Sequence, residues 1–281
     1  MPKERVGEQV FVFLSEAYAQ VTSTVILTNR GNVVVDSLLY PSEAEEVRAF
    51  ATRGGRPASY LINTHGHLDH VACNYVFRGA AIVAHSQVRQ AMRGVLRSDL
   101  GQAAEGIPEL RGAKMLPPNI TASAEVVLRH GGLTMRLIPL PGHSPDGIGV
   151  YIEEERILVA GDAVLPVPHF VAGDPDDLVR SLHRVRGLTL NTIVQGHGDM
   201  ILKGEVKEAI DYRLRYIKQV RRHVSDAVAA GASLKETLRA DIEAYGGSRL
   251  DLDGLTQQLH EDNVRYLYNR QSRAESVPVP A

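Results

Sequence analysis

The stretch Thr64-His-Gly-His-Leu-Asp-His70 decides the fold and the chemistry of this sequence. It follows Tyr60-Leu-Ile-Asn63, an apolar run typical of a buried strand, so its polar side chains are expected in a loop at the carboxyl end of that strand. Functional sites of open α/β sheets form at such strand ends. His65 and His67 are two residues apart, so their rings can point the same way on extended backbone. Imidazole and carboxylate are ligands of zinc, iron and manganese, so the stretch predicts a metal site.

Three further polar clusters follow β-branched runs in the same way, at His143, Asp162 and His197. Strands of one sheet that end at the same edge bring their last residues together. We therefore expect five histidines and two aspartates that are far apart in the sequence to meet in one place. The expected site comprises His65, His67, Asp69, His70, His143, Asp162 and His197.

The rest of the first 200 residues alternates strand and helix patterns. Strands are expected at 10–13, 23–28, 32–36, 60–64, 80–84, 125–129, 133–138, 150–152, 157–160 and 192–195. Ser42 with Glu45 predicts a capping box at the start of a helix, and Asp174-Pro175 predicts the start of another. Residues 99–123 are rich in glycine and proline and are expected to form a long loop, which we interpret as a lid.

The last quarter of the chain has a helical pattern. Helices are expected over 206–228, from the capping box of Ser233 and Glu236, and again from the point where Leu252, Leu255 and Leu259 begin a helical pattern. Residues 272–281 are expected to be a disordered tail. We therefore predict a catalytic domain over 1–204 and a helical extension over 205–281 that packs on the core. The apolar stripe of 206–228 is expected to pack inside the protein first, and to offer a homodimer face second.

Composition narrows the class of partner. The 281 residues carry a net charge of −2, without the basic excess of a nucleic-acid binder. Cys73 is the sole cysteine, so no intramolecular disulfide forms, and its thiol is expected to be buried. No signal-peptide pattern opens the chain, and no stretch approaches the roughly 18 apolar residues that span a bilayer. We expect a cytoplasmic protein that binds a small-molecule substrate, with no nucleic acid and no membrane as partner.

The run from Thr64 to His70 resembles the His-x-His-x-Asp-His signature of the metallo-β-lactamase superfamily. The other motifs of that family occur in the same order: Asp36 at the end of an early strand, His143 in Pro-Gly-His-Ser, Asp162 in Ala-Gly-Asp-Ala, and His197 in Gln-Gly-His-Gly. The resemblance covers about residues 8–200. It implies an α/β fold, a four-layer αββα sandwich with the metals at one edge.

The resemblance also implies a role for each residue. One metal would be held by His65, His67 and His143, and the second by Asp69, His70 and His197, with Asp162 between them. Asp36 would orient the ligand loop. Two Zn²⁺ ions are the expected cofactors, with Fe or Mn as the alternative. A water shared by two such ions has its pKa lowered from about 15.7 to near 7. The resulting hydroxide would attack a carbonyl, and Asp69 would act catalytically by accepting or relaying a proton.

The expected function is therefore a dinuclear metal-dependent hydrolase of a small-molecule thioester, lactone, ester or lactam. The first alternative is a mononuclear iron enzyme similar to persulfide dioxygenases, although His70 and His197 would then be spare. β-Lactamase activity, main or promiscuous, is the second; many zinc β-lactamases carry a cysteine at the position of Asp162. A binding protein without catalysis is disfavoured by the complete ligand set. His169 and Phe170 are expected to line the substrate pocket.

Overall fold

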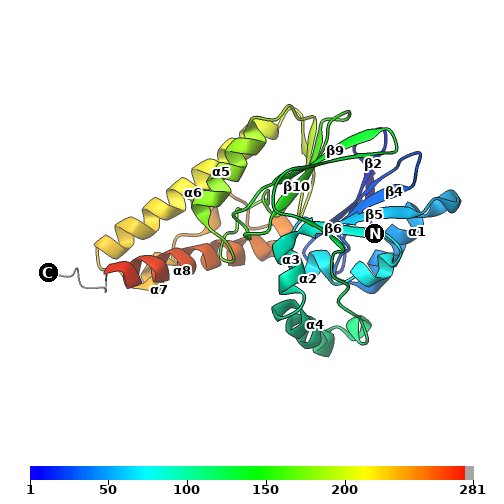
Figure 1. Ribbon diagram of the computed structural model, residues 1–281. Helices are drawn as coiled ribbons and strands as arrows, with labels where there is room; N and C mark the ends of the chain where they lie inside the picture. The colour runs from blue at the N-terminus through cyan, green and yellow to red at the C-terminus, as the bar shows by residue number, and fades with distance from the viewer. Residues whose placement is uncertain (276–281) are drawn as a thin grey trace.

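Two β-sheets packed face to face form the centre of the computed structural model, which describes residues 1–275 (Figure 1). The first sheet has the order β1-β2-β3-β4-β5-β6-β7, with β1 at Lys3–Arg5, β2 at Val10–Leu14, β3 at Thr22–Ile26, β4 at Asn32–Val35, β5 at Ala58–Ile62, β6 at Ala81–His85 and β7 at Ile120–Ala122. The second has the order β13-β12-β11-β10-β9-β8, with β8 at Val126–His130, β9 at Leu133–Pro139, β10 at Ile148–Ile152, β11 at Ile157–Gly161, β12 at Thr192–Gln195 and β13 at Ile201–Leu202.

Helices cover the outer face of each sheet (Figure 1). The α-helices are α1 at Pro41–Ala51, α2 at Leu68–Val71, α3 at Ser86–Ala91, α4 at Val95–Gly106, α5 at Pro175–Arg186, α6 at Val206–Ala229, α7 at Leu234–Thr237 and α8 at Leu255–Glu275. Short 3₁₀ helices lie at Arg53–Gly55, Asn74–Phe77, Pro108–Leu110, Ile242–Tyr245 and Asp251–Gly254. α1 lies on the side of the first sheet, and α5 and α6 lie on the side of the second (Figure 1).

Three apolar layers hold these four layers of structure together. Residues such as Val33 and Val159 fill the space between the sheets. Val47 and its neighbours join α1 to the first sheet, and Leu182 and Ile217 belong to the layer that joins α5 and α6 to the second. Burial of apolar surface at this scale is the dominant favourable term in folding. The four-layer αββα sandwich expected from the sequence is confirmed.

Parallel pairing sets the position of the site. β4 and β5 run parallel in the first sheet, and β11 and β12 run parallel in the second. Parallel neighbours end at the same edge, so the residues after each pair are brought together. The two edges also meet, because the backbone N–H of Ile148 donates to the Thr64 carbonyl over 2.7 Å. β9 is antiparallel to β10, and β10 is antiparallel to β11, so β9 runs in the same direction as β11 and brings His143 to the same edge. All the polar clusters predicted from the sequence therefore open onto one place.

Two sequence expectations are wrong in detail. Ser42 does not cap α1, because Pro41 occupies the first turn and Tyr40 is the N-cap residue, without a side-chain hydrogen bond. Residues 99–123 are not one long loop, since they begin inside α4. That helix forms despite Gly101, because Leu96 and Leu100 lie four residues apart and are both buried.

The C-terminal helices pack on the second sheet. The apolar stripe of α6 is buried in the same cluster as Ile193 of β12, which confirms its expected role in the core. α6 also lies against α8. α8 continues to Glu275, so the first residues of the expected tail 272–281 are helical, and the rest lie outside the described residues. The domain boundary at 204 and 205 stays a prediction. Over residues 1–275, no helix is long and apolar enough to cross a membrane.

Candidate metal centre

Seven side chains converge at the shared edge of the two sheets. They form two groups in which the potential ligand atoms lie within 4.8 Å of one another. The first group is His65, His67, His143 and Asp162, and the second is Asp69, His70 and His197. The structure therefore brings together all seven side chains that the sequence predicts as metal ligands, with Asp162 in the first group.

Asp162 lies between the two groups. Its Oδ2 is 3.1 Å from Nε2 of His143, in the first group. Its Oδ1 is 3.3 Å from Nε2 of His70 and 3.7 Å from Nε2 of His197, in the second. Each carboxylate oxygen thus faces a different group, which is the arrangement that a bridging ligand requires.

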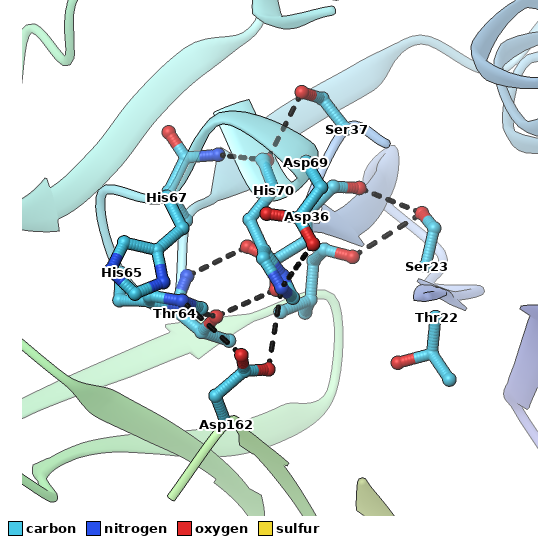
Figure 2. Close-up of polar contacts among 12 residues, drawn as sticks. Thr22, Ser23, Asp36, Ser37, Thr64, His65, His67, Asp69, His70 and Asp162 are labelled. Atoms are coloured by element: carbon cyan, nitrogen blue, oxygen red, sulfur yellow. Dashed lines mark hydrogen bonds and ion pairs between the residues drawn. The ribbon is translucent and has the colours of Figure 1, made fainter. Parts of the chain in front are cut away.

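Asp36 and Thr64 fix the orientation of two of the histidines (Figure 2). Nδ1 of His70 donates to Oδ2 of Asp36 over 2.9 Å. The Thr64 hydroxyl donates its one proton to the same oxygen over 2.7 Å, so it can only accept from Nδ1 of His65, which lies 3.1 Å away. In their neutral forms, both rings then present an unprotonated Nε2 to the cluster. A single carboxylate oxygen sets the tautomer of one histidine in each group.

The backbone of Asp36 is as constrained as its side chain. Its φ angle is +60°, a left-handed conformation that asparagine and aspartate adopt more readily than other residues. Its Oδ1 accepts from the backbone N–H of Thr64 over 2.7 Å, and its carbonyl accepts from the Ser23 hydroxyl over 2.7 Å (Figure 2). Strain of this kind persists where the surrounding structure fixes it, often at functional sites.

Backbone carbonyls orient two further histidines. Nδ1 of His143 donates to the carbonyl of His169 over 2.8 Å. Nδ1 of His197 donates to the carbonyl of Ala19 over 2.8 Å. Their Nε2 atoms are left to face the cluster. His67 presents its other ring nitrogen to the cluster, because its Nδ1 is the atom that lies 2.9 Å from Nε2 of His143.

Buried polar atoms without partners show that this donor set fits a metal. Among the described residues, Nε2 of His65, Nε2 of His70 and Oδ1 of Asp162 are buried and make no hydrogen bond. A buried polar atom left unpaired costs about 1–3 kcal/mol. Three such atoms that face one another are available as metal donors, and imidazole with carboxylate suits zinc, iron or manganese.

The charges of the cluster suit a cation as well. Burial opposes ionisation of Asp162, but His70 and His197 outweigh it and hold the pKa of Asp162 well below its usual range. Burial likewise opposes ionisation of Asp69, and the attraction of His70 lowers its pKa to about 2. Burial lowers the pKa of His143 to about 4. Burial lowers the pKa of His70 and of His197 as well, but Asp69 and Asp162 outweigh it and raise both, so a cation bound there would take the place of their protons. Ionised carboxylates and neutral imidazoles are the forms that bind metals.

Close approach of the backbone leaves no room for a side chain at Gly196, just before His197. A Cβ there would lie 1.8 Å from Oδ1 of Asp162 and 2.8 Å from the carbonyl carbon of Gly161. Glycine is the residue that permits such an approach. The Gly-His pair is therefore part of the geometry of the site.

Two features of the centre were not expected from the sequence. Ala19 and Gln20 have φ angles of +45° and +50°, and this turn presents the Ala19 carbonyl to His197 and places Tyr18 beside the centre, where burial and the charge of Asp69 raise its pKa. Nothing in the composition of this turn marks it. Arg213 of α6 is 5% exposed and donates to the Leu165 carbonyl over 2.7 Å. A charged residue inside the apolar stripe of α6 was a signal that could have found it.

Two cavities open beside the centre. One, of about 550 Å³, includes His67 and is lined mainly by α3, α4 and the loop after His143, with Ala91, Val95, Leu96, Pro145 and Ala172 among its residues. The other, of about 710 Å³, includes His169 and is lined by α8, with Arg265, Tyr266, Asn269, Arg270 and Arg273 among its residues.

The two residues expected to contact substrate differ in position. His169 lies at the edge of the second cavity, with its ring 5.6 Å from that of His143. The side chain of Phe170 is fully buried and packs against Tyr266 at 6.0 Å between ring centroids. The ring of Phe170 is thus a core group, since α8 covers it, and it does not line the cavity.

Comparison with known proteins agrees with the geometry. The matching family is described as "Metallo-beta-lactamase superfamily" and spans residues 18–201. The chain is 29% identical over 164 residues to the hydroxyacylglutathione hydrolase GloC of Haemophilus influenzae, which covers 53% of this chain and 73% of that protein. It is 27% identical over 212 residues to the atrochrysone carboxyl ACP thioesterase of Aspergillus fumigatus, with 72% and 59% covered. The chain spans less than two thirds of the length of some relatives it matches.

Solved structures show the same fold. A metallo-beta-lactamase family protein from Thermus thermophilus superposes with a TM-score of 0.67 at 17% identity. The superposition covers 97% of this chain and 96% of that one, so it includes the C-terminal helices. The likeness therefore extends beyond the residues that carry the motifs.

Proposed function

The chain belongs to the metallo-beta-lactamase superfamily, and from this membership and the geometry of the centre we propose that it is a dinuclear metal-dependent hydrolase of acyl thioesters. One observation carries the proposal: the two oxygens of Asp162 face two separate groups of ligands. A mononuclear centre would leave the second group without a role. Two thioester-cleaving relatives support the choice of substrate.

We assign one metal to His65, His67 and His143, and the other to Asp69, His70 and His197, with Asp162 bridging and Asp36 as the residue that orients His70. The native metals in this proposal are two Zn²⁺ ions, because zinc accepts imidazole and carboxylate in open sites. The division of the side chains into two groups supports the assignment.

Bound metals would supply a water of lowered pKa and a positive charge for the developing oxyanion. The protein's own contribution lies in Asp69, which is the more exposed of the two carboxylates, at 16%. With a pKa of about 2 it is ionised at neutral pH and can accept a proton from the attacking water. It can then release that proton to the leaving thiolate. Nε2 of His197 lies 3.2 Å from Oδ2 of Asp69, as expected for two ligands of the same metal.

The two cavities support a thioester with an acyl arm and an anionic thiol arm. The cavity beside His67 has apolar walls, which suit an acyl chain. The cavity beside His169 is lined by Arg265 and Arg270, which suit carboxylate or phosphate groups. These arginines pair at the surface with Glu261 and Asp174, and exposed pairs of this kind are weak enough to be exchanged for a ligand.

The test is the metal content of the purified protein, measured by mass spectrometry, followed by hydrolysis assays with acyl-glutathione, acyl-CoA, lactone and β-lactam substrates. We expect about two zinc ions per chain and the highest kcat/KM on a thioester. An Asp162→Ala variant should lose the bridge between the two metals and, with it, the activity. One iron per chain, or full turnover by Asp162→Ala, would refute the proposal and favour the persulfide-dioxygenase alternative in the first case. The cytoplasmic location and a homodimer stay predictions.

A further inference from the structure

A buried asparagine on the C-terminal helix forms two hydrogen bonds with the loop that orients His143. Asn263 of α8 is fully buried. Its Nδ2 donates to the carbonyl of Pro168 over 2.6 Å, and its Oδ1 accepts from the backbone N–H of Phe170 over 3.2 Å. The two bonds hold the residues on either side of His169. The carbonyl between them is the one that accepts from Nδ1 of His143.

The amide of Asn263 has one orientation that satisfies its neighbours. Nε2 of His260 donates to the Ala240 carbonyl over 3.0 Å, so its Nδ1 accepts from the Tyr216 hydroxyl over 2.9 Å. The Tyr216 oxygen is then free to accept from Nδ2 of Asn263, which lies 3.1 Å away. His260 and Tyr216 are also buried. The donor and the acceptor of each hydrogen bond in this series, from His260 through Tyr216 and Asn263 to the loop, are therefore fixed.

We propose that Asn263 is a positioning residue for the first metal, acting through the 168–170 loop and His143. This inference rests on the proposed metal centre, but not on the proposed substrate. It assigns the C-terminal extension a part in metal binding, although Asn263 lies outside the family match at residues 18–201. The apolar contact between Phe170 and Tyr266 holds the loop against α8, and Asn263 gives the loop its direction.

The proposal makes a one-sided prediction. His143 belongs to the first group of ligands, whereas Asp69, His70 and His197 form the second. Loss of the two hydrogen bonds from Asn263 should lower the affinity for the first metal and leave the affinity for the second unchanged. A residue that merely stabilises the fold would weaken both metals equally.

The experiment measures Co²⁺ affinity of the full chain by chelator competition, with visible absorption as the signal. Asn263→Ala is made alone and together with His197→Ala, which removes a ligand of the second group so that the first metal is observed by itself. Gln258→Ala is the control, because Gln258 is exposed on the same helix and bonds to Asp262 one turn away. We expect a loss of about 10–100-fold at the first metal in Asn263→Ala, as is usual when a residue behind a ligand is removed, and no loss in the control.

If Asn263→Ala does not fold, Asn263→Asp replaces it. Aspartate keeps the size and the bond from Phe170, but sets an oxygen against the Pro168 carbonyl, so the same one-sided loss is expected. Unchanged affinity in a folded variant, equal loss at both metals, or failure of both variants to fold would overturn the proposal. A wild-type protein that binds no metal would instead refute the proposed function.

Discussion

Replacing Asp36 with asparagine should weaken the binding of both metals, because one atom, Oδ2 of Asp36, is replaced by an amide nitrogen. Asparagine tolerates the left-handed backbone at this position, so the substitution changes the acceptor and not the fold of the loop. The carboxylate accepts three hydrogen bonds, of 2.7, 2.7 and 2.9 Å. If the amide oxygen remains on the backbone N–H of Thr64, the amide nitrogen faces His70 and the Thr64 hydroxyl. His70 must then move its proton to Nε2, where it blocks the metal.

The effect reaches His65 through Thr64. An amide nitrogen donates to the Thr64 hydroxyl, so the hydroxyl turns its own proton toward Nδ1 of His65, and that ring also acquires the wrong tautomer. Residues behind metal ligands contribute about 10–100-fold to affinity, or about 1.4–2.8 kcal/mol per metal. If the amide flips instead, the buried Thr64 N–H loses its acceptor, and the free energy of unfolding falls by about 1–3 kcal/mol.

A matched variant separates the two paths. Thr64→Val keeps the shape of the side chain and removes the hydroxyl, so it should weaken the metal held by His65 and spare the one held by His70. Chelator competition with Co²⁺ on both variants, with urea unfolding of the metal-free proteins, gives the two affinities and the stability. The reasoning is refuted if Asp36→Asn binds both metals as the wild type does, or if Thr64→Val weakens both equally.

Three further outcomes follow from the structure. Gly196→Ala should cost about 1–3 kcal/mol in urea unfolding, because its Cβ would meet Asp162 and the Gly161 backbone; Gly204→Ala, with nothing within 4 Å, is the control, and equal effects would contradict the argument. Removing metals with a chelator should lower the melting temperature, since a metal at 100 times its Kd stabilises the fold by about 2.7 kcal/mol; an unchanged melting curve would argue against metal binding. Burial raises the pKa of the Cys73 thiol, which donates to the Leu39 carbonyl, so Cys73 should react with a thiol reagent at pH 8 only after unfolding; rapid reaction of the folded protein would contradict this.

The ligands could be predicted from the sequence because each one follows a strand. Strand patterns are strong where β-branched residues repeat, and parallel strands of a sheet end at one edge. That logic places His65, Asp162 and His197 together without any knowledge of the fold. Asp36 also follows a strand, β4, but its role was inferred from the family resemblance and not from the strand pattern.

Other features were beyond the sequence for physical reasons. Gly101 and Gly106 suggested a loop, but both are open to solvent, where glycine costs a helix only about 1 kcal/mol and buried leucines can offset it. At Ser42, the preceding proline fits the first turn better than a serine fits the cap. The acceptors of His143 and His197 are backbone carbonyls, which every residue carries, so no side-chain pattern marks them.

The histidines of the centre therefore fall into two classes, those oriented by side-chain acceptors and those oriented by backbone carbonyls, and the sequence motifs do not show this difference. His65 and His70 are oriented by Asp36 and Thr64, so their anchors are encoded within the first sheet and its ligand loop. His143 and His197 are oriented by carbonyls whose positions depend on distant packing. For His143 this is the hydrogen bonding of Asn263 on α8 to the loop, and for His197 it is the strained turn at Ala19. A substitution far from every motif can therefore change metal affinity at these two histidines, whereas His65 and His70 respond mainly to changes that the motif itself would reveal. In this chain the ligand pattern identifies the site and anchors one histidine of each group, and elements outside the pattern orient a second histidine of each group.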